Sequence, residues 1–499
     1  MKQMNFEKKI WNDDQYIGSN WSAQFNTAKM SQLSKLGRDS IEQLEKMNLS
    51  QMKNSRFWRK SDRYFLNISY PSLQAMDYIS QNSILDVIEA IGERPIALYV
   101  HVPFCKAACY YCHYYKKFNK SENEVDSYID TLLLELQNIS NITGGKLRCK
   151  SIYFGGGTPS YMSAKQIDRI IRGIHRYCDL EPKAEFSFEM HPESSDLDRI
   201  KAIIEGGVNR ISIGVESLED KVLKSENRRH SSADVKKAVE RVHKVGVNTI
   251  NLDFIYGLMN QTLEGWENTL KSALSLHPDS VTSYRLRLKK GSSEFKKWKL
   301  DKTLFPTEDE ILLMHAMSMV FWEDYNGYRQ SPIDWFIKDQ KSFHFYQDHN
   351  WRKTEETPLL GIGPSAYSCI DNMQFYNIND TSMWAEKIHS GNLGSWKGYE
   401  INQDDAMRRS IMLGIKFGVD IKWFSKTFNR LPTDIFKKEL KELESLGLIS
   451  FKDNIISLTR KGTLFADEIG QFFYGEKVAK QMQQIPVEMI SSTFPQFNK

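Results

Sequence analysis

Short runs of β-branched and aromatic residues recur through the middle of this chain, and amphipathic stretches of helical period separate them. Each run spans about 4–8 residues, as is typical of strands buried in a parallel sheet. The predicted strands lie at 96–102, 151–154, 185–190, 210–215, 249–254 and 280–286, and the predicted helices at 123–139, 164–177, 233–245 and 264–276. Strands that alternate with helices predict parallel β/α units. We therefore expect an α/β fold with six such units.

The segments on either side of this array follow different patterns and predict further parts. The start of the chain is polar with scattered aromatics and a predicted helix at 27–48, whereas helices and then a short hairpin, typical of a winged helix, come near the end. An aromatic-rich region lies between the array and these helices, after a predicted helix at 308–325. The predicted boundaries are 1–90 for an N-terminal extension packed on the barrel, 91–330 for the barrel, 331–402 for a connecting region that completes the active site, 403–475 for a winged-helix-like α+β domain and 476–499 for a loosely held tail.

Glycine and polar residues gather where the predicted strands end. Three cysteines follow the first strand, Gly155–Gly157 with Thr158 the second, Glu189 the third, Gly214 with Glu216 the fourth, Asp253 the fifth, and Arg285 with Arg287 the sixth. In a β/α barrel the chemistry takes place at the carboxyl ends of the strands. The sequence therefore predicts one site at that end.

Half of the six cysteines, Cys105, Cys109 and Cys112, form a C-x3-C-x2-C motif directly after the first strand. Three thiolates on one tight loop can bind three irons of a [4Fe–4S] cluster and leave the fourth iron open. An open iron can chelate the amino and carboxylate groups of S-adenosylmethionine (SAM), whose reductive cleavage gives a 5′-deoxyadenosyl radical. We predict this cluster and this cofactor.

Two other interpretations of the motif remain. A zinc site needs four closed ligands, and His101 or His113 could supply the fourth. Three purely structural cysteines on one loop are the other alternative, although reactive thiols without a function are a liability. The scattered Cys149, Cys178 and Cys369 are predicted to be ordinary buried thiols.

Charge and hydropathy limit the partners and the cellular location that we expect. The net charge of +4 over 499 residues gives no reason to expect a nucleic acid or an anionic membrane as a partner. The first residues have no apolar core, and no run of eighteen apolar residues occurs, so neither a secretory signal nor a membrane span is predicted. We expect a cytoplasmic protein.

Four motifs resemble the radical SAM superfamily and, more narrowly, the oxygen-independent coproporphyrinogen III oxidase-like (HemN-like) family. They are Tyr-Val-His-Val-Pro-Phe-Cys at 99–105, Phe-Gly-Gly-Gly-Thr-Pro-Ser at 154–160, Asn-Arg-Ile-Ser-Ile-Gly-Val at 209–215 and Asn-Leu-Asp-Phe-Ile-Tyr-Gly-Leu at 251–258. The resemblance runs from about 95 to 475. It implies a partial (β/α)6 TIM-like barrel of radical SAM type, a small-molecule substrate such as a tetrapyrrole, and an electron donor such as flavodoxin or ferredoxin.

The same resemblance implies roles for residues at the strand ends. Tyr99 and Glu189 would be catalytic residues beside the cluster-bound SAM, and the loop with Gly156 would contact its amino end. The plain alternatives are a core position for Tyr99, a simple turn for the glycines and a structural pairing of Glu189 with Arg210 or another cation. A second SAM is also implied, with contacts that carry over onto Tyr111, Gly157, Thr158, Glu216, Arg228 and Asp253, and with Arg287 close by. The alternatives there are a surface position for Arg228 and a helix N-cap for Asp253.

Three positions depart from the family's pattern. The oxidase has Gln where this chain has Glu216, and an ionised Glu only accepts hydrogen bonds, so a ligand carboxylate would be repelled. Arg287 stands where a small residue is typical, and it would either crowd the second SAM or bind a substrate acid. After the third cysteine, His113-Tyr114-Tyr115 replaces the usual Gly-Cys, and His113 is either a proton donor or a plain loop residue.

Three functions follow from the family. The first is hydrogen abstraction from a porphyrinogen-like or other organic substrate, which leads to oxidative decarboxylation. The second is C-methyl transfer with two SAM molecules. The third is a non-catalytic haem chaperone that keeps the fold and the cluster. The presence of Arg228 and Asp253 favours two SAM molecules and hence the first two functions.

Overall fold

A parallel sheet of six strands forms the centre of the computed structural model, which describes residues 33–52, 55–58, 69–71, 73–112, 114–289, 292–352 and 354–484. The strands β2 (Ile96–Val102), β5 (Leu147–Gly156), β6 (Cys178–Met190), β7 (Arg210–Glu216), β8 (Thr249–Tyr256) and β9 (Ser280–Arg285) pair in this order, each parallel to the next. All six predicted strands are confirmed. The predicted α/β fold class is confirmed with them.

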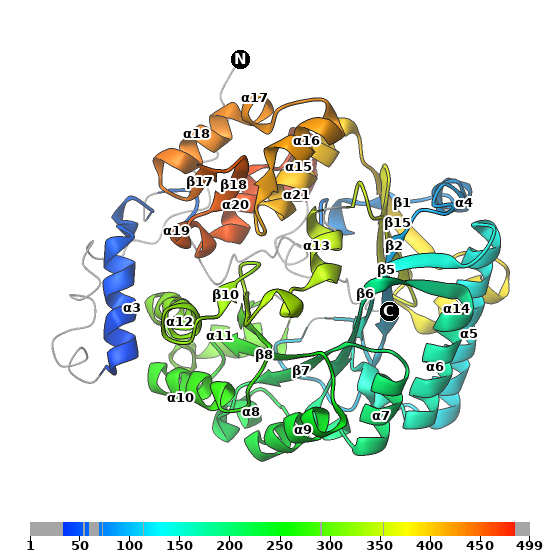
Figure 1. Ribbon diagram of the computed structural model, residues 1–499, viewed down its shortest axis with the longest axis horizontal. Helices are drawn as coiled ribbons and strands as arrows, with labels where there is room; N and C mark the ends of the chain where they lie inside the picture. The colour runs from blue at the N-terminus through cyan, green and yellow to red at the C-terminus, as the bar shows by residue number, and fades with distance from the viewer. Residues whose placement is uncertain are drawn as a thin grey trace.

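Helices cover the outer face of this sheet as an arc along its side (Figure 1). They are α5 (Glu122–Ile142), α6 (Ala164–Tyr177), α7 (Leu197–Glu205), α8 (Asp220–Ser225), α9 (Ser232–Val245) and α10 (Leu263–Leu274). The four predicted helices are among them, whereas α7 and α8 were missed because both are short. Ser121 and Ser163 are the N-cap residues of α5 and α6, and each forms a capping box. In this motif the serine side chain accepts from the backbone N–H three residues on, and the side chain of that residue accepts from the serine backbone.

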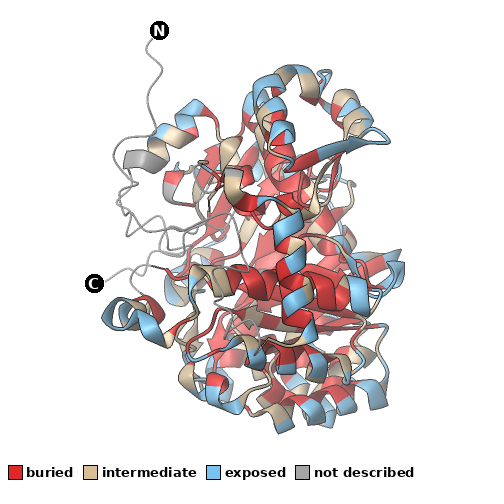
Figure 2. Ribbon diagram, turned by 90° about the vertical axis from the view of Figure 1, so that its left-hand side faces the viewer, coloured by how far each residue is buried: buried red, intermediate tan, exposed pale blue. Residues whose placement is uncertain are grey.

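Burial explains why the central strands have nearly continuous apolar sequences. In β2 six of the seven residues are buried and one is half-buried, and the same numbers hold for β7. Strands covered on both faces lack the polar alternation of a half-exposed sheet. Figure 2 shows buried positions concentrated in the sheet and on the inner faces of the helices.

The aromatic-rich region after the barrel extends the sheet on both sides. β12 (Leu359–Ile362) joins β2 in parallel, and β13 (Tyr367–Ile370), β14 (Met373–Asn377), β15 (Ser395–Glu400) and β1 (Asp77–Tyr78) follow in antiparallel order. On the far side β11 (Trp335–Ile337) pairs with β9, and β10 (Arg329–Gln330) pairs with β11. The sheet has thirteen strands among the described residues. The helices α13 (Phe345–Arg352) and α14 (Thr381–His389) belong to the same region.

The described parts of the first 90 residues lie against later elements. α3 (Lys35–Lys46) packs on α12 (Glu308–Met319), and η1 (Leu49–Met52), η3 (Leu73–Ala75) and α4 (Gln81–Glu89) follow. The predicted helix at 27–48 overlaps α3, while residues 27–32 lie outside the described residues. The predicted helix at 308–325 is α12 followed by a π-helical turn, Val320–Tyr325.

The C-terminal part has the predicted order of helices followed by a hairpin. Its elements are α15 (Gln403–Gly414), β16 (Val419–Asp420), α16 (Ile421–Phe428), α17 (Pro432–Ile435), α18 (Lys437–Ser445), β17 (Ile449–Lys452), β18 (Ile455–Leu458), α19 (Arg460–Thr463), α20 (Ala466–Phe472) and α21 (Glu476–Gln484). The start of the predicted tail is therefore a helix, and its Val478 is buried. Residues 485–499 lie outside the described residues.

Candidate active site

A cavity of about 440 Å³ opens at the carboxyl ends of the central strands. It is lined by every site residue that the sequence predicts: Tyr99, Cys105, Cys109, Tyr111, Cys112, Gly156, Gly157, Thr158, Glu189, Glu216, Arg228, Asp253 and Arg287. These residues lie on five of the six central strands and in the segments that follow the central strands. The fold thus brings together what the strand-end pattern predicted, whereas the role of each residue remains a proposal.

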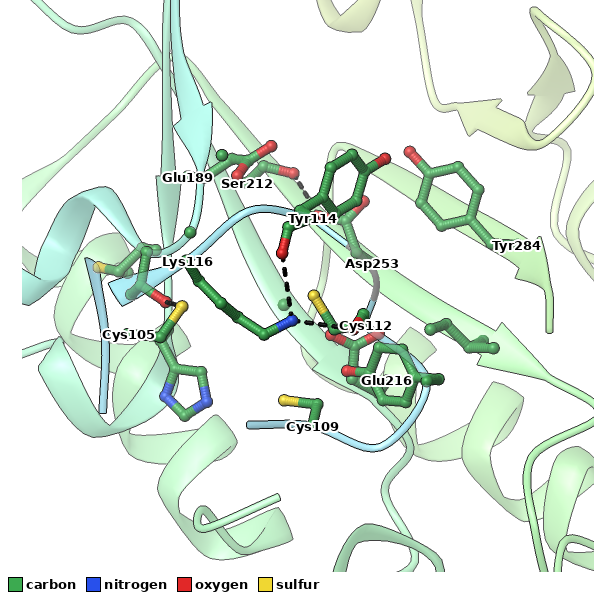
Figure 3. A pocket seen from close by; sticks show the side chains of 18 of the residues that line it. Cys105, Cys109, Cys112, Tyr114, Lys116, Glu189, Ser212, Glu216, Asp253 and Tyr284 are labelled. Atoms are coloured by element: carbon green, nitrogen blue, oxygen red, sulfur yellow. Dashed lines mark hydrogen bonds between the residues drawn. The ribbon is translucent and has the colours of Figure 1, made fainter. Parts of the chain in front are cut away.

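The cysteine loop is closed at its base by a short parallel pair, β3 (Phe104–Cys105) and β4 (Lys117–Phe118). Inside the loop, the Lys116 ammonium donates to the carbonyl oxygens of Cys112 at 2.8 Å and Tyr114 at 3.3 Å. In Figure 3 the three cysteine side chains surround this ammonium. Burial raises the pKa of the Cys105 thiol to about 11, and the nearby Lys116 works against that rise.

Two of the cysteine sulfurs have polar neighbours of the kind that suits the ligands of an iron–sulfur cluster. The Cys109 sulfur accepts a hydrogen bond from Arg228 Nη1 at 3.4 Å, and the Cys105 sulfur lies 3.5 Å from Thr158 Oγ1. Cationic and hydroxyl groups of this kind balance the negative charge of a thiolate-bound cluster. Across the described part of the chain, which leaves out His113, no three His, Cys, Asp or Glu side chains gather closely enough to hold one metal ion.

Two glycines after β5 pack tightly against the cysteine segment. A Cβ on Gly157 would lie 2.8 Å from the carbonyl oxygen of Phe104, and one on Gly156 would lie 2.7 Å from the His101 ring. Gly156 also has a φ of +109°, a conformation that favours glycine. This packing explains both glycines without a ligand, so their predicted contact with SAM stays a prediction.

Glu189, one residue before the end of β6, has a buried carboxyl group with specific hydrogen bonds. Tyr153 donates its hydroxyl to Glu189 Oε1 at 2.7 Å, and the Gly156 backbone donates as well. Burial raises the pKa of Glu189 to about 7, against the effect of these hydrogen bonds. Arg210, the structural partner considered from the sequence, instead donates to Ser342 O and Ser280 Oγ. The pairing with Arg210 is therefore wrong, and the hydrogen bonds to Glu189 come from Tyr153 and the Gly156 backbone.

Stacked aromatic rings form one wall of the cavity. The rings of Tyr153 and Tyr346 lie 4.7 Å apart, and Tyr99 stacks on both. The Tyr99 hydroxyl is 3.0 Å from His101 Nδ1. Sequence reasoning did not find Tyr346, nor the other lining residues of its region, although the aromatic-rich composition was the signal: Trp335, Trp351, Tyr367 and Tyr376.

Arg228 and Glu216 form a buried ion pair in the cavity. Arg228 Nη2 lies 3.4 Å from Glu216 Oε1 and donates to Gly214 O, and the Arg228 side chain is only 7% exposed. The surface alternative for Arg228 is therefore wrong. Burial raises the pKa of Glu216, whereas Arg228 pulls it down. The pair leaves a cation beside a carboxylate, which is a chemistry able to bind a zwitterionic ligand.

Asp253 lies within β8 and not at a helix start, so the N-cap alternative is wrong. Ser212 donates to one of its oxygens at 2.6 Å and Asn251 to the other at 2.9 Å. Burial raises the pKa of the Asp253 carboxyl. Arg287, after β9, has its guanidinium 5.9 Å from the Tyr284 ring centre. His113 lies outside the described residues, so neither interpretation of it is tested.

Comparisons with known proteins agree with this geometry. Residues 99–273 match the family model of the radical SAM superfamily, and residues 401–465 match that of the HemN C-terminal domain. The solved coproporphyrinogen III oxidase (HemN) from Escherichia coli, described as a radical SAM enzyme, matches 85% of this chain and 98% of its own, with 26% identity and a TM-score of 0.73.

Two kinds of curated relative match at similar levels. The haem chaperone HemW of Bacillus subtilis (strain 168) is 29% identical over 76% of this chain and 99% of its own length. The oxygen-independent coproporphyrinogen III oxidase of Escherichia coli (strain K12) is 26% identical over 81% and 91%. A parallel β/α array whose first strand leads into a three-cysteine loop defines a radical SAM protein. The chain belongs to the radical SAM superfamily, in its oxygen-independent coproporphyrinogen III oxidase-like (HemN-like) family. This family implies a [4Fe–4S] cluster and SAM.

No helix in the described segments combines the length and the apolar character needed to cross a membrane.

Proposed function

We propose that this chain is a radical SAM enzyme that abstracts hydrogen from a porphyrinogen-like or other small organic substrate, as a step of oxidative decarboxylation. One observation carries the proposal: the three cysteines, Glu189 and the ion pair of Arg228 with Glu216 all line one cavity. An external one-electron donor such as flavodoxin or ferredoxin belongs to this proposal, because no other redox group is implied by the family.

The residues of the cavity divide into a cluster end and a ligand end. Cys105, Cys109 and Cys112 would hold three irons. Glu189, with a pKa of about 7, would accept from the amino group of SAM, which favours its ionised form. When bound, the cluster and SAM together supply a 5′-deoxyadenosyl radical that takes a hydrogen atom from carbon. The stacked rings of Tyr153 and Tyr346 beside Glu189 would keep water away from the reacting atoms.

C-methyl transfer with a second SAM is the other enzymatic candidate. The buried cation Arg228 and the carboxyl group of Asp253 line the same cavity as the cysteines, and both match positions implied to hold a second SAM. Arg228 can bind a ligand carboxylate, although Glu216 beside it opposes this. Because the chain is also similar to a haem chaperone, the experiment has to distinguish a third, non-catalytic function as well.

The products of SAM cleavage distinguish these functions. The full chain is reconstituted anaerobically with iron and sulfide and given SAM, a reductant and candidate substrates. 5′-Deoxyadenosine alone supports hydrogen abstraction, and its appearance together with S-adenosylhomocysteine supports methyl transfer. Haem uptake without any cleavage of SAM would contradict the enzymatic proposal. A Cys109→Ala variant that keeps its full iron content and cleaves SAM would contradict the assignment of the cluster.

A further inference from the structure

Two glutamates meet in a small buried cluster beside the cysteine loop. Glu226 follows α8, Glu294 lies in the first turn of α11 (Ser293–Leu300), and both residues are 0% exposed. Their carboxyl groups are within hydrogen-bond distance of one another. Glu226 Oε1 accepts from the backbone N–H of Met259 at 2.8 Å. Their other three oxygens accept no N–H or O–H from the described residues.

The surroundings of this pair are apolar. Val222, Leu258, Met259, Leu286, Leu288, Phe295 and Phe305 form a separate hydrophobic cluster at this place, with Tyr111 packed against it. Two ionised carboxylates held together in such a medium would repel each other strongly. A single proton between them turns the repulsion into a strong hydrogen bond.

We propose that Glu226 and Glu294 share one proton in a carboxyl–carboxylate hydrogen bond, which fastens α11 to the segment that holds the cysteine loop in place. The two glutamates and Asn227 are then positioning residues for the loop. This inference goes beyond the proposed function, since it concerns how the loop is held and not what the bound cofactor does.

The segment that holds the loop consists of three successive residues. The Tyr110 backbone N–H donates to the carbonyl oxygen of Glu226 at 3.2 Å. The side chain of Asn227 donates to the carbonyl oxygen of Ala108 at 2.7 Å. Arg228 then donates to the sulfur of Cys109 at 3.4 Å. Residues 108–110 are thus held on both sides of the middle cysteine by consecutive groups of one segment.

The charges around the pair do not neutralise it. Lys297 of α11 lowers the pKa of both carboxyl groups, but its ammonium lies 3.4 Å from the Tyr110 ring centre and donates to Ser225 O. Lys224 of α8 is exposed, and the segment after β8 contributes the Met259 backbone. On the loop itself, Tyr111 packs against the apolar cluster around the pair.

The pH dependence follows from this setting. Burial, and after it the neighbouring Glu294 carboxyl group, together raise the pKa of Glu226 to about 9. The native pair therefore keeps a proton that an unfolded chain releases near its ordinary value of 4.5. The native pair therefore binds more protons than the unfolded chain between these values, and the fastening weakens as the pH rises toward about 9. The loop is held most firmly on the acidic side of this range.

The test compares the full reconstituted chain with Glu294→Gln and with the control Glu240→Gln, which removes the same charge from an exposed position on α9. A Gln amide donates a permanent hydrogen bond to Glu226 and needs no shared proton. The rate at which a chelator removes cluster iron is measured at about pH 6.5, where the native pair keeps its proton, and at about pH 9, near the midpoint of its titration. We expect the wild type and Glu240→Gln to lose iron roughly tenfold faster at the higher pH, and Glu294→Gln to change little.

Amide hydrogen exchange provides a second readout that needs no cluster. After correction for the intrinsic effect of pH, exchange in residues 293–300 and 108–110 should rise with pH in the wild type and stay nearly constant in Glu294→Gln. Glu226→Gln, which keeps an oxygen for the Met259 N–H, should behave like Glu294→Gln and serves if that variant folds poorly. Parallel pH profiles in the wild type and both variants would overturn the inference. Failure to assemble any cluster would instead count against the proposed function and leave this exchange measurement valid.

Discussion

Removing the hydroxyl of Tyr153 is expected to shift the pH range in which the protein binds SAM. Tyr153 donates to Glu189 Oε1 at 2.7 Å, and this bond stabilises the ionised carboxylate. A hydrogen bond to a charged group contributes about 1.5–3 kcal/mol, which corresponds to about one to two pH units of pKa. Tyr153→Phe should therefore raise the pKa of Glu189 above its value of about 7 by that amount.

The consequence for binding follows from the charge on Glu189. At pH 7 about half of the wild-type carboxyl groups are ionised, since the pKa is about 7. In Tyr153→Phe the ionised share falls to roughly a tenth or less, so the affinity for a ligand ammonium falls roughly fivefold or more at this pH. The loss of affinity should disappear at higher pH, where Glu189 is ionised in both the wild type and the variant.

The assay is the dissociation constant of SAM, measured anaerobically by equilibrium dialysis across the pH range. Tyr346→Phe is the matched control, because its ring stacks on Tyr153 while Tyr153 is the one that donates to Glu189. We expect the control to follow the wild type and Tyr153→Phe to be displaced toward higher pH. An affinity that is lowered equally at every pH, or not at all, would refute the reasoning that Glu189 binds the amino group as a carboxylate.

Three further predictions concern assembly and stability. Gly157→Ala should lower the iron content of the reconstituted protein, because its Cβ would stand 2.8 Å from the cysteine segment's backbone; a full iron content would contradict this. Arg228→Met should destabilise the fold by about 3–5 kcal/mol in denaturant unfolding at neutral pH, since Glu216 keeps a buried charge without its partner, and the loss should shrink at acidic pH as Glu216 protonates. Glu185→Gln should flatten the fall in stability between the ordinary carboxyl pKa and about pH 2: burial raises the pKa of Glu185, but His344, which is charged at acidic pH, and nearby hydrogen bonds outweigh it and hold that pKa at about 2; an unchanged acid unfolding curve would count against this reasoning.

Local patterns were sufficient for the barrel and for the edge at which the site lies. A strand buried on both faces must be apolar along its length, and the residues after it must change character. The six central strands and their polar ends could therefore be located without any contact information. The three cysteines lie within eight residues, so their spacing alone indicated a shared ligand. The same logic failed between residues 328 and 400, where short antiparallel strands and aromatic side chains carry no clear period.

Only the tertiary structure decided which groups meet. The sequence placed Asp253 and Glu189 at strand ends, and the resemblance pointed to Arg228. Their burial, and the choice of Tyr153 over Arg210 as partner of Glu189, depend on neighbours from other strands. Glu226 and Glu294 are separated by several elements, and neither residue stands out in its own segment. Spacing along a chain determines what a segment can become, whereas the energy of a buried charge depends on what the rest of the chain packs beside it.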